Sequence, residues 1–251
     1  MSVFQALILG VLQGITEFLP ISSSGHLILL PNFLGWEVQS LAFDTILHLG
    51  TSAALIVYFW SELPKFFNDK SFLKLILVGT IPALFFGVIF GEIIENYFRS
   101  IQYVVIFLTL GSILMFLAEK FYRKKWHSER MSYFEKLSLR EGLIVGIFQS
   151  LSLLSGVSRS GSTISGGMFM GLTREAAARF SFILSIPVVI AAGVFKIFDS
   201  YQELSIDVPI IFGFIASAVT GIIVIKYLLK FLKTNNLYVF IIYIVTQSLN
   251  D

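Results

Sequence analysis

Long apolar runs separated by short polar turns make up almost the whole chain. A helix that spans a membrane needs about 20 predominantly apolar residues, and six uninterrupted runs approach or reach that length. They predict membrane-spanning helices at roughly 42–60, 72–92, 101–121, 176–197, 208–230 and 236–249.

Two further apolar stretches, 3–34 and 140–172, are interrupted by polar residues and glycines. In the first of them, Pro20 ends one helix, and Ser22-Ser23-Ser24-Gly25 is a cap-and-turn sequence that begins another. Irregular backbone at membrane depth is tolerated only where it lines a polar cavity. We therefore expect each stretch to form a re-entrant helix–loop–helix hairpin that enters the membrane and leaves on the same side.

The chain contains an internal repeat. A shift of 136 positions places residues 13–26 on residues 149–162, and a shift of 137 places Phe43, Ile46 and Leu47 on Phe180, Ile183 and Leu184. The sequence thus predicts an all-α integral membrane protein with two repeats, 1–122 and 140–251, joined by a cytoplasmic linker at 123–139. Each repeat has one hairpin and three spans, and an odd number of crossings inverts the second repeat relative to the first. The first shift pairs Gly10 with Gly146, Gln13 with Gln149, Ser22 with Ser158, Ser24 with Ser160, and Gly25 with Gly161.

Composition supports the membrane assignment. Of the 251 residues, 56% are hydrophobic and only 14% are charged, against about 25% charged in soluble domains. Continuous apolar runs exclude a transmembrane β-barrel, whose strands alternate. The first apolar run has no basic leader and is interrupted by polar residues, so we expect no removable signal peptide. The absence of cysteine excludes disulfides, thiol catalysis and thiolate metal sites.

The distribution of basic residues predicts the orientation. With the linker in the cytoplasm, 15 of the 18 Lys and Arg residues are cytoplasmic, Arg99 and Lys196 lie outside, and Arg159 lies within the second hairpin. This asymmetry follows the positive-inside rule. We expect both termini outside, the first hairpin entering from outside and the second from the cytoplasm, with their tips meeting near the middle of the membrane.

The first hairpin carries reactive groups. Gln13 and Glu17 lie one helical turn apart on one face, and a carboxylate at this depth is costly and usually functional. His26 stands beside three serines and can serve as a nucleophile or as an acid for a leaving group. The alternatives are that Glu17 is a structural partner of Arg159 and that His26 is a structural histidine.

The second helix of each hairpin begins with a serine-rich turn, and these two helix starts predict an anion site. Free N–H groups at a helix start attract anions, and the Arg159 guanidinium can bind phosphate through two nitrogens. For any single serine, a helix cap is the alternative. We expect phosphate or pyrophosphate to contact Gln13, Ser22, Ser24, Gly25, Ser158, Ser160, Gly161, Ser162 and Thr163.

The sequence gives weaker indications of a metal site and of a function for the remaining polar residues. Glu17 with Gln13 can hold one Mg²⁺ or Ca²⁺ ion together with substrate phosphate, although the sequence does not demand it. No His/Cys/Asp cluster points to a transition metal. Asp44 and His48, at the start of the first span, are expected to have no catalytic part, with a supporting part as the alternative. His127 in the linker is expected to be solvated.

At these residues the chain resembles the undecaprenyl-diphosphate phosphatase family of the bacitracin-resistance type, over essentially its whole length. The family's first motif, Glu/Gln-Gly-x-Thr-Glu-Phe-Leu-Pro-x-Ser-Ser-x-Gly-His, is matched by Gln13 to His26. The second, Pro-Gly-x-Ser-Arg-Ser-Gly-x-Thr, is matched by Gly156 to Thr163. Two positions depart from the pattern. Gln13 stands where many members have a second Glu, which puts metal binding in doubt, and Ser155 replaces the Pro.

The resemblance implies hydrolysis of undecaprenyl diphosphate to the monophosphate at the outer face of the cytoplasmic (inner) membrane, which recycles the lipid carrier of cell-envelope synthesis. It implies Glu17, Ser23, His26 and Arg159 as catalytic residues, with Mg²⁺ or Ca²⁺ as cofactor. For the nucleophile we favour Ser23 activated by Glu17, then His26, then a water activated by Glu17. Expected partners are the polyprenyl diphosphate and membrane lipids, with no nucleic acid; a homodimer is left open.

Two rival functions fit parts of the pattern. A carrier that flips a polyprenyl phosphate across the membrane suits an inverted repeat and needs Arg159, but it has no evident use for Glu17 and His26 beside a serine. A lipid-binding membrane protein without chemistry explains neither hairpin.

Overall fold

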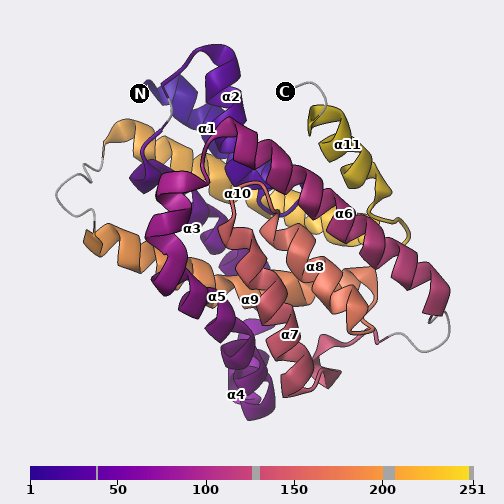
Figure 1. Cartoon of the computed structure of the whole chain (residues 1–251). Helices are drawn as coiled ribbons and strands as arrows, with labels where there is room; N and C mark the ends of the chain where they lie inside the picture. Colours follow the sequence, from indigo (N-terminus) through magenta and orange to yellow (C-terminus); the bar gives the residue numbers. More distant parts are fainter. Residues whose placement is uncertain (38, 126–130, 200–206, 249–251) are drawn as a thin grey trace.

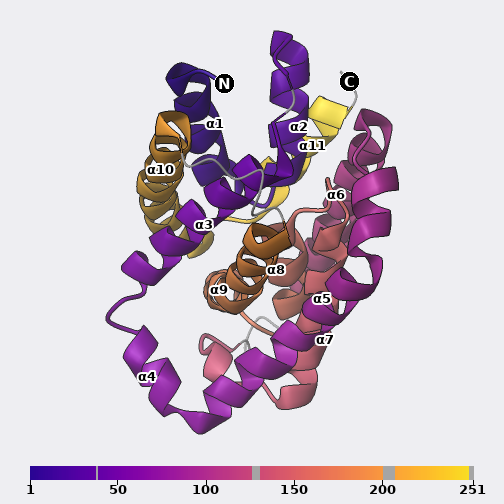
Figure 2. The same cartoon turned by 90° about the vertical axis from the view of Figure 1, so that its left-hand side faces the viewer.

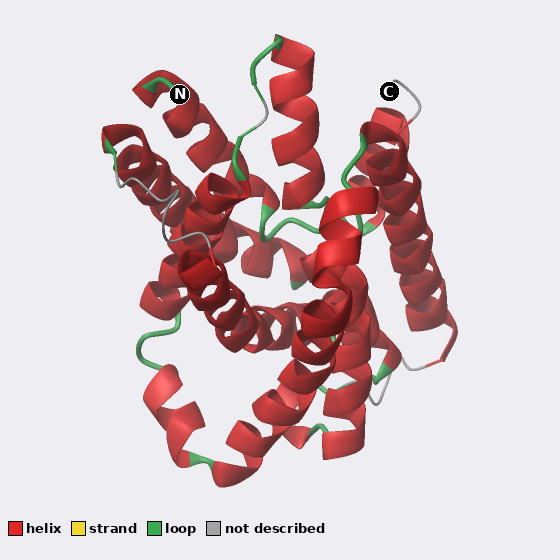
Figure 3. Ribbon diagram, turned by 60° about the vertical axis from the view of Figure 1, so that its left-hand side comes forward, coloured by secondary structure: helices red, strands yellow, loops and turns green. Residues whose placement is uncertain are grey.

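The computed structural model describes residues 1–37, 39–125, 131–199 and 207–248. Apart from one isolated bridge between Met131 and Leu172, the regular elements of these ranges are all helical (Figure 3). Residues 126–130 of the expected linker, including His127, lie outside the described residues. In chain order the elements are α1 (Val3–Thr16), α2 (Ser23–Leu34), α3 (Leu41–Tyr58), α4 (Leu63–Asn68), α5 (Lys70–Tyr97), α6 (Ile101–Lys125), η1 (Phe134–Lys136), α7 (Leu139–Ser150), η2 (Leu151–Leu153), α8 (Arg159–Phe169), α9 (Arg174–Asp199), α10 (Val208–Leu232) and α11 (Tyr238–Ser248).

Five helices of the described chain are long and apolar enough to cross a membrane: α3, α5, α6, α9 and α10. Their outer faces carry large apolar side chains at helical spacing, a surface that water-soluble proteins rarely expose. The chain is therefore a multi-pass helical membrane protein. Examples of the exposed stripes are Leu77, Ile81, Phe85 and Val88 on α5, Ile106, Leu110, Ile113 and Leu117 on α6, and Ile211, Ile215, Val219 and Ile223 on α10.

The sixth predicted span, 236–249, differs from the helix found there. α11 has 11 residues, which at 1.5 Å per residue extend about 16 Å, against a hydrocarbon core of about 30 Å. Lys233 and Thr234 form a turn after α10, and the chain bends at Leu237, so the helix starts at Tyr238 and not at 236. The short helix α4, between the first two spans, was not predicted.

The repeat seen in the sequence recurs in the local structure. α1 and α7 both begin with a capping box, Ser2 with Gln5 and Ser138 with Glu141. α2 and α8 are each capped by a serine whose side-chain oxygen accepts a hydrogen bond from the backbone N–H three residues later. The distance is 3.4 Å from Gly25 N to Ser22 Oγ and 3.1 Å from Gly161 N to Ser158 Oγ. Each such cap satisfies N–H groups that the helix itself leaves free.

The first helix of each half packs against a membrane-spanning helix of the other half. α1 packs along α10, and α7 packs along α5. The contacts are close because of glycine: a Cβ on Gly10 would lie 2.5 Å from the carbonyl oxygen of Gly213, and Gly146 meets the backbone of Gly79 in the same way. α3 and α9, the first spans of the two halves, pack against each other between these pairs (Figures 1 and 2).

The two hairpins approach each other from opposite ends of the molecule. Both termini lie at one end, and α4 and the start of α7 lie at the other (Figures 1 and 2). At that second end, Met131 exchanges backbone hydrogen bonds with Gly171 and Thr173, of 3.1 and 3.0 Å, which ties the end of α8 to the segment before α7. The turns of the hairpins meet in the interior, where Ser160 Oγ donates to Leu19 O at 3.1 Å.

A buried ion pair joins three helices at a distance from these turns. Glu119, which is fully buried, accepts from Nε and Nη2 of Arg174 at 2.7 and 2.6 Å. The same carboxylate accepts from Leu237 N at 2.9 Å, and the guanidinium lies 3.9 Å from the ring centroid of Tyr122. The ion pair thereby holds α6, α9 and the start of α11 together.

Replacement of Glu119 by Gln should destabilise the fold by about 3–5 kcal/mol, because it leaves Arg174 buried without its counter-ion. Thermal unfolding of the purified chain in detergent measures this. The matched control is Glu62→Gln, which breaks a pair with Arg179 whose side chains are 34% and 30% exposed and should cost less than about 1 kcal/mol. Equal shifts in the two variants would contradict a fastening role for Glu119.

Candidate active site

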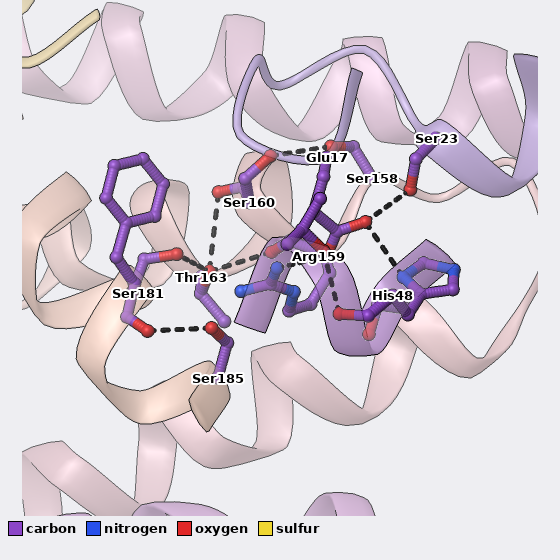
Figure 4. Close-up of polar contacts among 12 residues, drawn as sticks. Glu17, Ser23, His48, Ser158, Arg159, Ser160, Thr163, Ser181 and Ser185 are labelled. Carbon is purple, nitrogen blue, oxygen red and sulfur yellow. Dashed lines mark hydrogen bonds and ion pairs between the residues drawn. The ribbon is translucent and has the colours of Figure 1, made fainter. Parts of the chain in front are cut away.

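Glu17 is the centre of a buried polar cluster at the meeting point of the two hairpins (Figure 4). It caps the C-terminal end of α1. Its Oε2 accepts from Ser23 Oγ at 2.6 Å and from Gln13 Nε2 at 2.9 Å. Its Oε1 forms an ion pair with Nη2 of Arg159. The carboxylate thus links α1, α2 and α8.

Arg159 is the first residue of α8 and supplies the positive charge of the cluster. Its side chain is 11% exposed. Nη2 is paired with Glu17, whereas Nε and Nη1 are buried and have no hydrogen-bond partner among the described residues. Buried donors without partners are rare and costly in folded proteins, so these two nitrogens are suited to receive an anion.

His48 of α3 belongs to the same cluster. Its Nδ1 lies 2.9 Å from Gln13 Nε2 and 3.1 Å from Glu17 Oε2. This position next to Glu17 favours the alternative of a supporting part for His48, which was expected to have no catalytic part. Asp44, one turn earlier, lies outside this cluster and pairs with Arg99 at 3.1 Å.

Hydroxyl groups lie on the α8 and α9 side of Arg159 (Figure 4). Thr163 Oγ1 donates to the carbonyl of Arg159 at 2.7 Å and contacts Ser181 Oγ of α9. Ser185, one turn further along α9, donates to Phe182 O at 2.7 Å. These side chains are almost completely buried, so the site has a carboxylate side and a hydroxyl side.

His26 has different partners. Its Nδ1 lies 2.7 Å from Ser22 O, and its Nε2 lies 2.8 Å from the hydroxyl of Tyr243 on α11. The two rings are stacked with centroids 5.7 Å apart. Because a carbonyl only accepts, Nδ1 carries the proton, and the neutral ring then accepts from Tyr243 at Nε2.

The remaining predicted residues build the two helix starts. Ser22 and Ser158 are the caps, and each contacts the serine two positions on: Ser24 Oγ at 3.3 Å and Ser160 Oγ at 3.1 Å. The N–H groups of Gly25 and Gly161 donate to these caps. Ser162 Oγ donates to Ser158 O at 2.9 Å.

Ser22 also has a strained backbone, with φ of 68°. A non-glycine residue in this region costs on the order of 1–3 kcal/mol and is found most often at functional sites. The conformation allows the Ser22 carbonyl to accept from both the backbone N–H and the ring of His26.

The repeat contained a signal for the residues that the sequence reading missed. The shift of 137 that aligns the first spans places Asp44 on Ser181 and His48 on Ser185. One face of α3 and one face of α9 therefore carry polar residues at equivalent positions, and His48 of the first and Ser181 of the second contact Glu17 and Thr163 in the cluster. Tyr243 had no such signal, because it lies 217 positions from His26.

The cluster has the parts of a phosphoryl-transfer site. The Ser23 hydroxyl is hydrogen-bonded to the Glu17 carboxylate, which can act as a base, and further side chains position that carboxylate. Arg159 and two helix starts provide positive potential next to it.

Comparison with known proteins agrees with this chemistry. Residues 6–249 match the family described as bacitracin resistance protein BacA. A protein of Chloroherpeton thalassium named undecaprenyl-diphosphatase is 40% identical, over 97% of this chain and 93% of that protein. Proteins with the same name from Thermodesulfovibrio yellowstonii and Methanosphaera stadtmanae are 42% and 40% identical, over 96% and 97% of this chain and 92% and 94% of theirs. These matches confirm the resemblance indicated by the two motifs: the chain belongs to the bacitracin resistance protein BacA family.

Proposed function

We propose that this chain hydrolyses undecaprenyl diphosphate to undecaprenyl phosphate and inorganic phosphate. Its relatives carry the name of that activity. The observation that carries the proposal is Arg159: a buried guanidinium, with two nitrogens that have no partner in the described part of the chain, is paired with the carboxylate that accepts from Ser23. A carrier needs the guanidinium, but it does not need the Ser23–Glu17 pair.

The diphosphate binds where the two hairpin turns meet. Nε and Nη1 of Arg159 donate to oxygens of the terminal phosphoryl group. N–H groups in the first turns of α2 and α8 that the serine caps leave open add the positive ends of two helix dipoles. These donors hold the charge that develops on the phosphoryl oxygens in the transition state.

Ser23 is the nucleophile that the contacts favour. Its Oγ attacks the terminal phosphorus while its proton passes to Glu17 Oε2, 2.6 Å away. The bond from phosphorus to the bridging oxygen breaks, and undecaprenyl phosphate leaves with the proton that Glu17 gives to that oxygen. Water then attacks the phosphoserine while its proton passes to the freed Glu17 carboxylate. The bond from phosphorus to Ser23 Oγ breaks, phosphate leaves, and Glu17 returns the proton to Ser23 Oγ. His26 ranks second, because both ring nitrogens already have partners, and direct attack by water activated by Glu17 ranks third.

The repeats, 1–122 and 140–251, form an inverted pair in this proposal. The equivalent capping boxes and the exchange of α1 and α7 between the halves support it. The hairpins are re-entrant, the termini lie outside, and the linker is cytoplasmic, in line with the distribution of basic residues. The site then opens to the outer face of the cytoplasmic membrane, where the prenyl tail reaches it from the lipid.

Mg²⁺ or Ca²⁺ is part of the proposal as well. Gln13 is fully buried, and its Oε1 has no hydrogen-bond partner among the described residues, so a hard oxygen donor is available on the residue whose Nε2 contacts the Glu17 carboxylate. A bound divalent cation would neutralise charge on the diphosphate, and Mg²⁺ is typically held by one or two carboxylates and substrate phosphates.

The purified full chain in detergent should release phosphate from a long-chain prenyl diphosphate, and Ser23→Ala should lower that rate at least about a thousandfold. Ser112→Ala is the matched control, because Ser112 is also buried and its hydroxyl donates within α6, to Thr109 O at 2.7 Å. No release by the unaltered chain would favour the carrier. Near-normal release by Ser23→Ala would move the nucleophile to His26 or water.

A further inference from the structure

Three side-chain atoms from α1 and α3 form a small triangle inside the site. Gln13 Nε2 lies 2.9 Å from Glu17 Oε2 and 2.9 Å from His48 Nδ1, and the last two atoms lie 3.1 Å apart. Every side of this triangle has the length of a hydrogen bond.

No arrangement of protons satisfies all three sides. If Gln13 donates to both neighbours, His48 Nδ1 is unprotonated and its lone pair faces the carboxylate. If Nδ1 carries a proton for Glu17, that proton faces the amide hydrogens of Gln13. If the carboxamide turns by a half-rotation, its oxygen accepts from His48 but faces the oxygen of Glu17. An imidazole nitrogen is a donor or an acceptor, and never both.

The arrangement in which Gln13 donates to both neighbours also leaves the Gln13 side-chain oxygen without a hydrogen bond within the described part of the chain. Oε1 is buried and has no partner among the described residues, and an unsatisfied buried acceptor is destabilising. A half-turn of the carboxamide exchanges the two atoms, so that the oxygen takes the place of the nitrogen in the triangle and the NH2 group takes the place that had no partner in the described ranges. The triangle then consists of two oxygens and one nitrogen, all three with lone pairs directed inward, which is the donor set of a divalent cation.

The size of the triangle restricts the ion. Donors 2.0–2.1 Å from a metal in octahedral geometry lie about 2.9 Å apart, whereas the longer bonds of Ca²⁺ separate neighbouring donors by about 3.3 Å or more. The observed sides of 2.9, 2.9 and 3.1 Å therefore fit an ion of the size of Mg²⁺. The imidazole adds a preference for first-row transition metals, which bind mixed nitrogen and oxygen donors well.

We propose that His48 is the third donor, with Gln13 and Glu17, of a cation-binding face in which this chain replaces a second carboxylate by an amide and an imidazole. Glu17 and Arg159 already form an ion pair, so the charge of the cation is balanced chiefly by the diphosphate, and the two bind together. The proposal rests on the proposed phosphatase site for the source of that diphosphate.

Pulsed electron paramagnetic resonance of bound Mn²⁺ tests the proposal without measuring turnover. The probe is Mn²⁺ added to the purified full chain in detergent with methylenediphosphonate, which cannot be hydrolysed. The unaltered chain should show one bound Mn²⁺ with modulation from an imidazole ¹⁴N nucleus. His48→Ala should abolish that modulation and weaken Mn²⁺ binding about tenfold or more.

The matched control is His26→Ala, which removes the other described histidine near the turns and should keep the ¹⁴N modulation. No bound Mn²⁺, bound Mn²⁺ without nitrogen modulation, modulation that persists in His48→Ala, or modulation lost in His26→Ala would each overturn the role of His48. Phosphate release is measured separately on the same preparations. A chain that hydrolyses the substrate but fails the Mn²⁺ test refutes this inference and leaves the phosphatase function standing.

Discussion

Arg159→Lys should lower phosphate release from a long-chain prenyl diphosphate at least about a thousandfold. Lysine keeps the positive charge beside Glu17 but offers a single ammonium group in place of a planar fork. Nε and Nη1, which have no partner within the residues that the structure describes, are the donors assigned to the phosphoryl group. Their loss removes stabilisation of the transition state while the ion pair with Glu17 persists.

The choice of lysine matters because alanine would mix two effects. Arg159→Ala leaves a carboxylate that is 5% exposed without its counter-ion, and breaking a buried pair in this way costs about 3–5 kcal/mol. Loss of activity could then reflect unfolding. Arg179→Lys, at a half-exposed pair with Glu62, is the control and should keep activity within about twofold. Turnover of Arg159→Lys within tenfold of the unaltered chain would contradict phosphate binding by the guanidinium.

Glu17→Gln should abolish turnover for a different reason, with a loss of about a thousandfold or more. The amide has the shape of the carboxylate but cannot take the proton of Ser23, whose hydroxyl lies 2.6 Å from Oε2. It also frees Nη2 of Arg159 from its ion pair. The variant should therefore still bind methylenediphosphonate, whereas Arg159→Lys should bind it more weakly.

Binding and turnover together separate the two residues. Isothermal titration with methylenediphosphonate and phosphate release should show Glu17→Gln as binding but inactive, and Arg159→Lys as weakened in both. A melting temperature for each variant in detergent confirms that the fold persists. Glu17→Gln with near-normal turnover would show that another group accepts the proton, and the assignment of Glu17 as base would be lost.

The sequence predicts those parts of the site that depend on local chemistry. The cap at Ser22, its counterpart at Ser158 and the shared face of Gln13 and Glu17 follow from helix geometry and side-chain type alone. The pairing of Glu17 with Arg159 was the alternative interpretation of Glu17, and it rests on the cost of leaving either charge alone in an apolar chain.

The parts that the sequence does not predict depend on how distant helices cross. From the sequence, a histidine in an apolar helix is most simply interpreted as a structural residue. His48 contacts Gln13 because α3 packs beside α1, which the sequence does not show. Tyr243 reaches His26 from a helix that begins later and runs shorter than the apolar pattern indicated. Hydropathy gives the length of a run, but it does not give the angle at which one helix meets another.

The exchange of helices between the halves has a consequence for biosynthesis. α1 leaves the ribosome first, yet α10, the helix it packs along, begins about 200 residues later, which at 5–20 residues per second is a delay of about 10–40 s. Glu17 lacks Arg159 until the second hairpin has been made, and the glycine face of α1 that fits against Gly213 has no partner for the whole interval. The earliest helix of the chain is thus among the last to reach its final neighbours, and the membrane-insertion machinery must keep the first hairpin competent until the second half has been made.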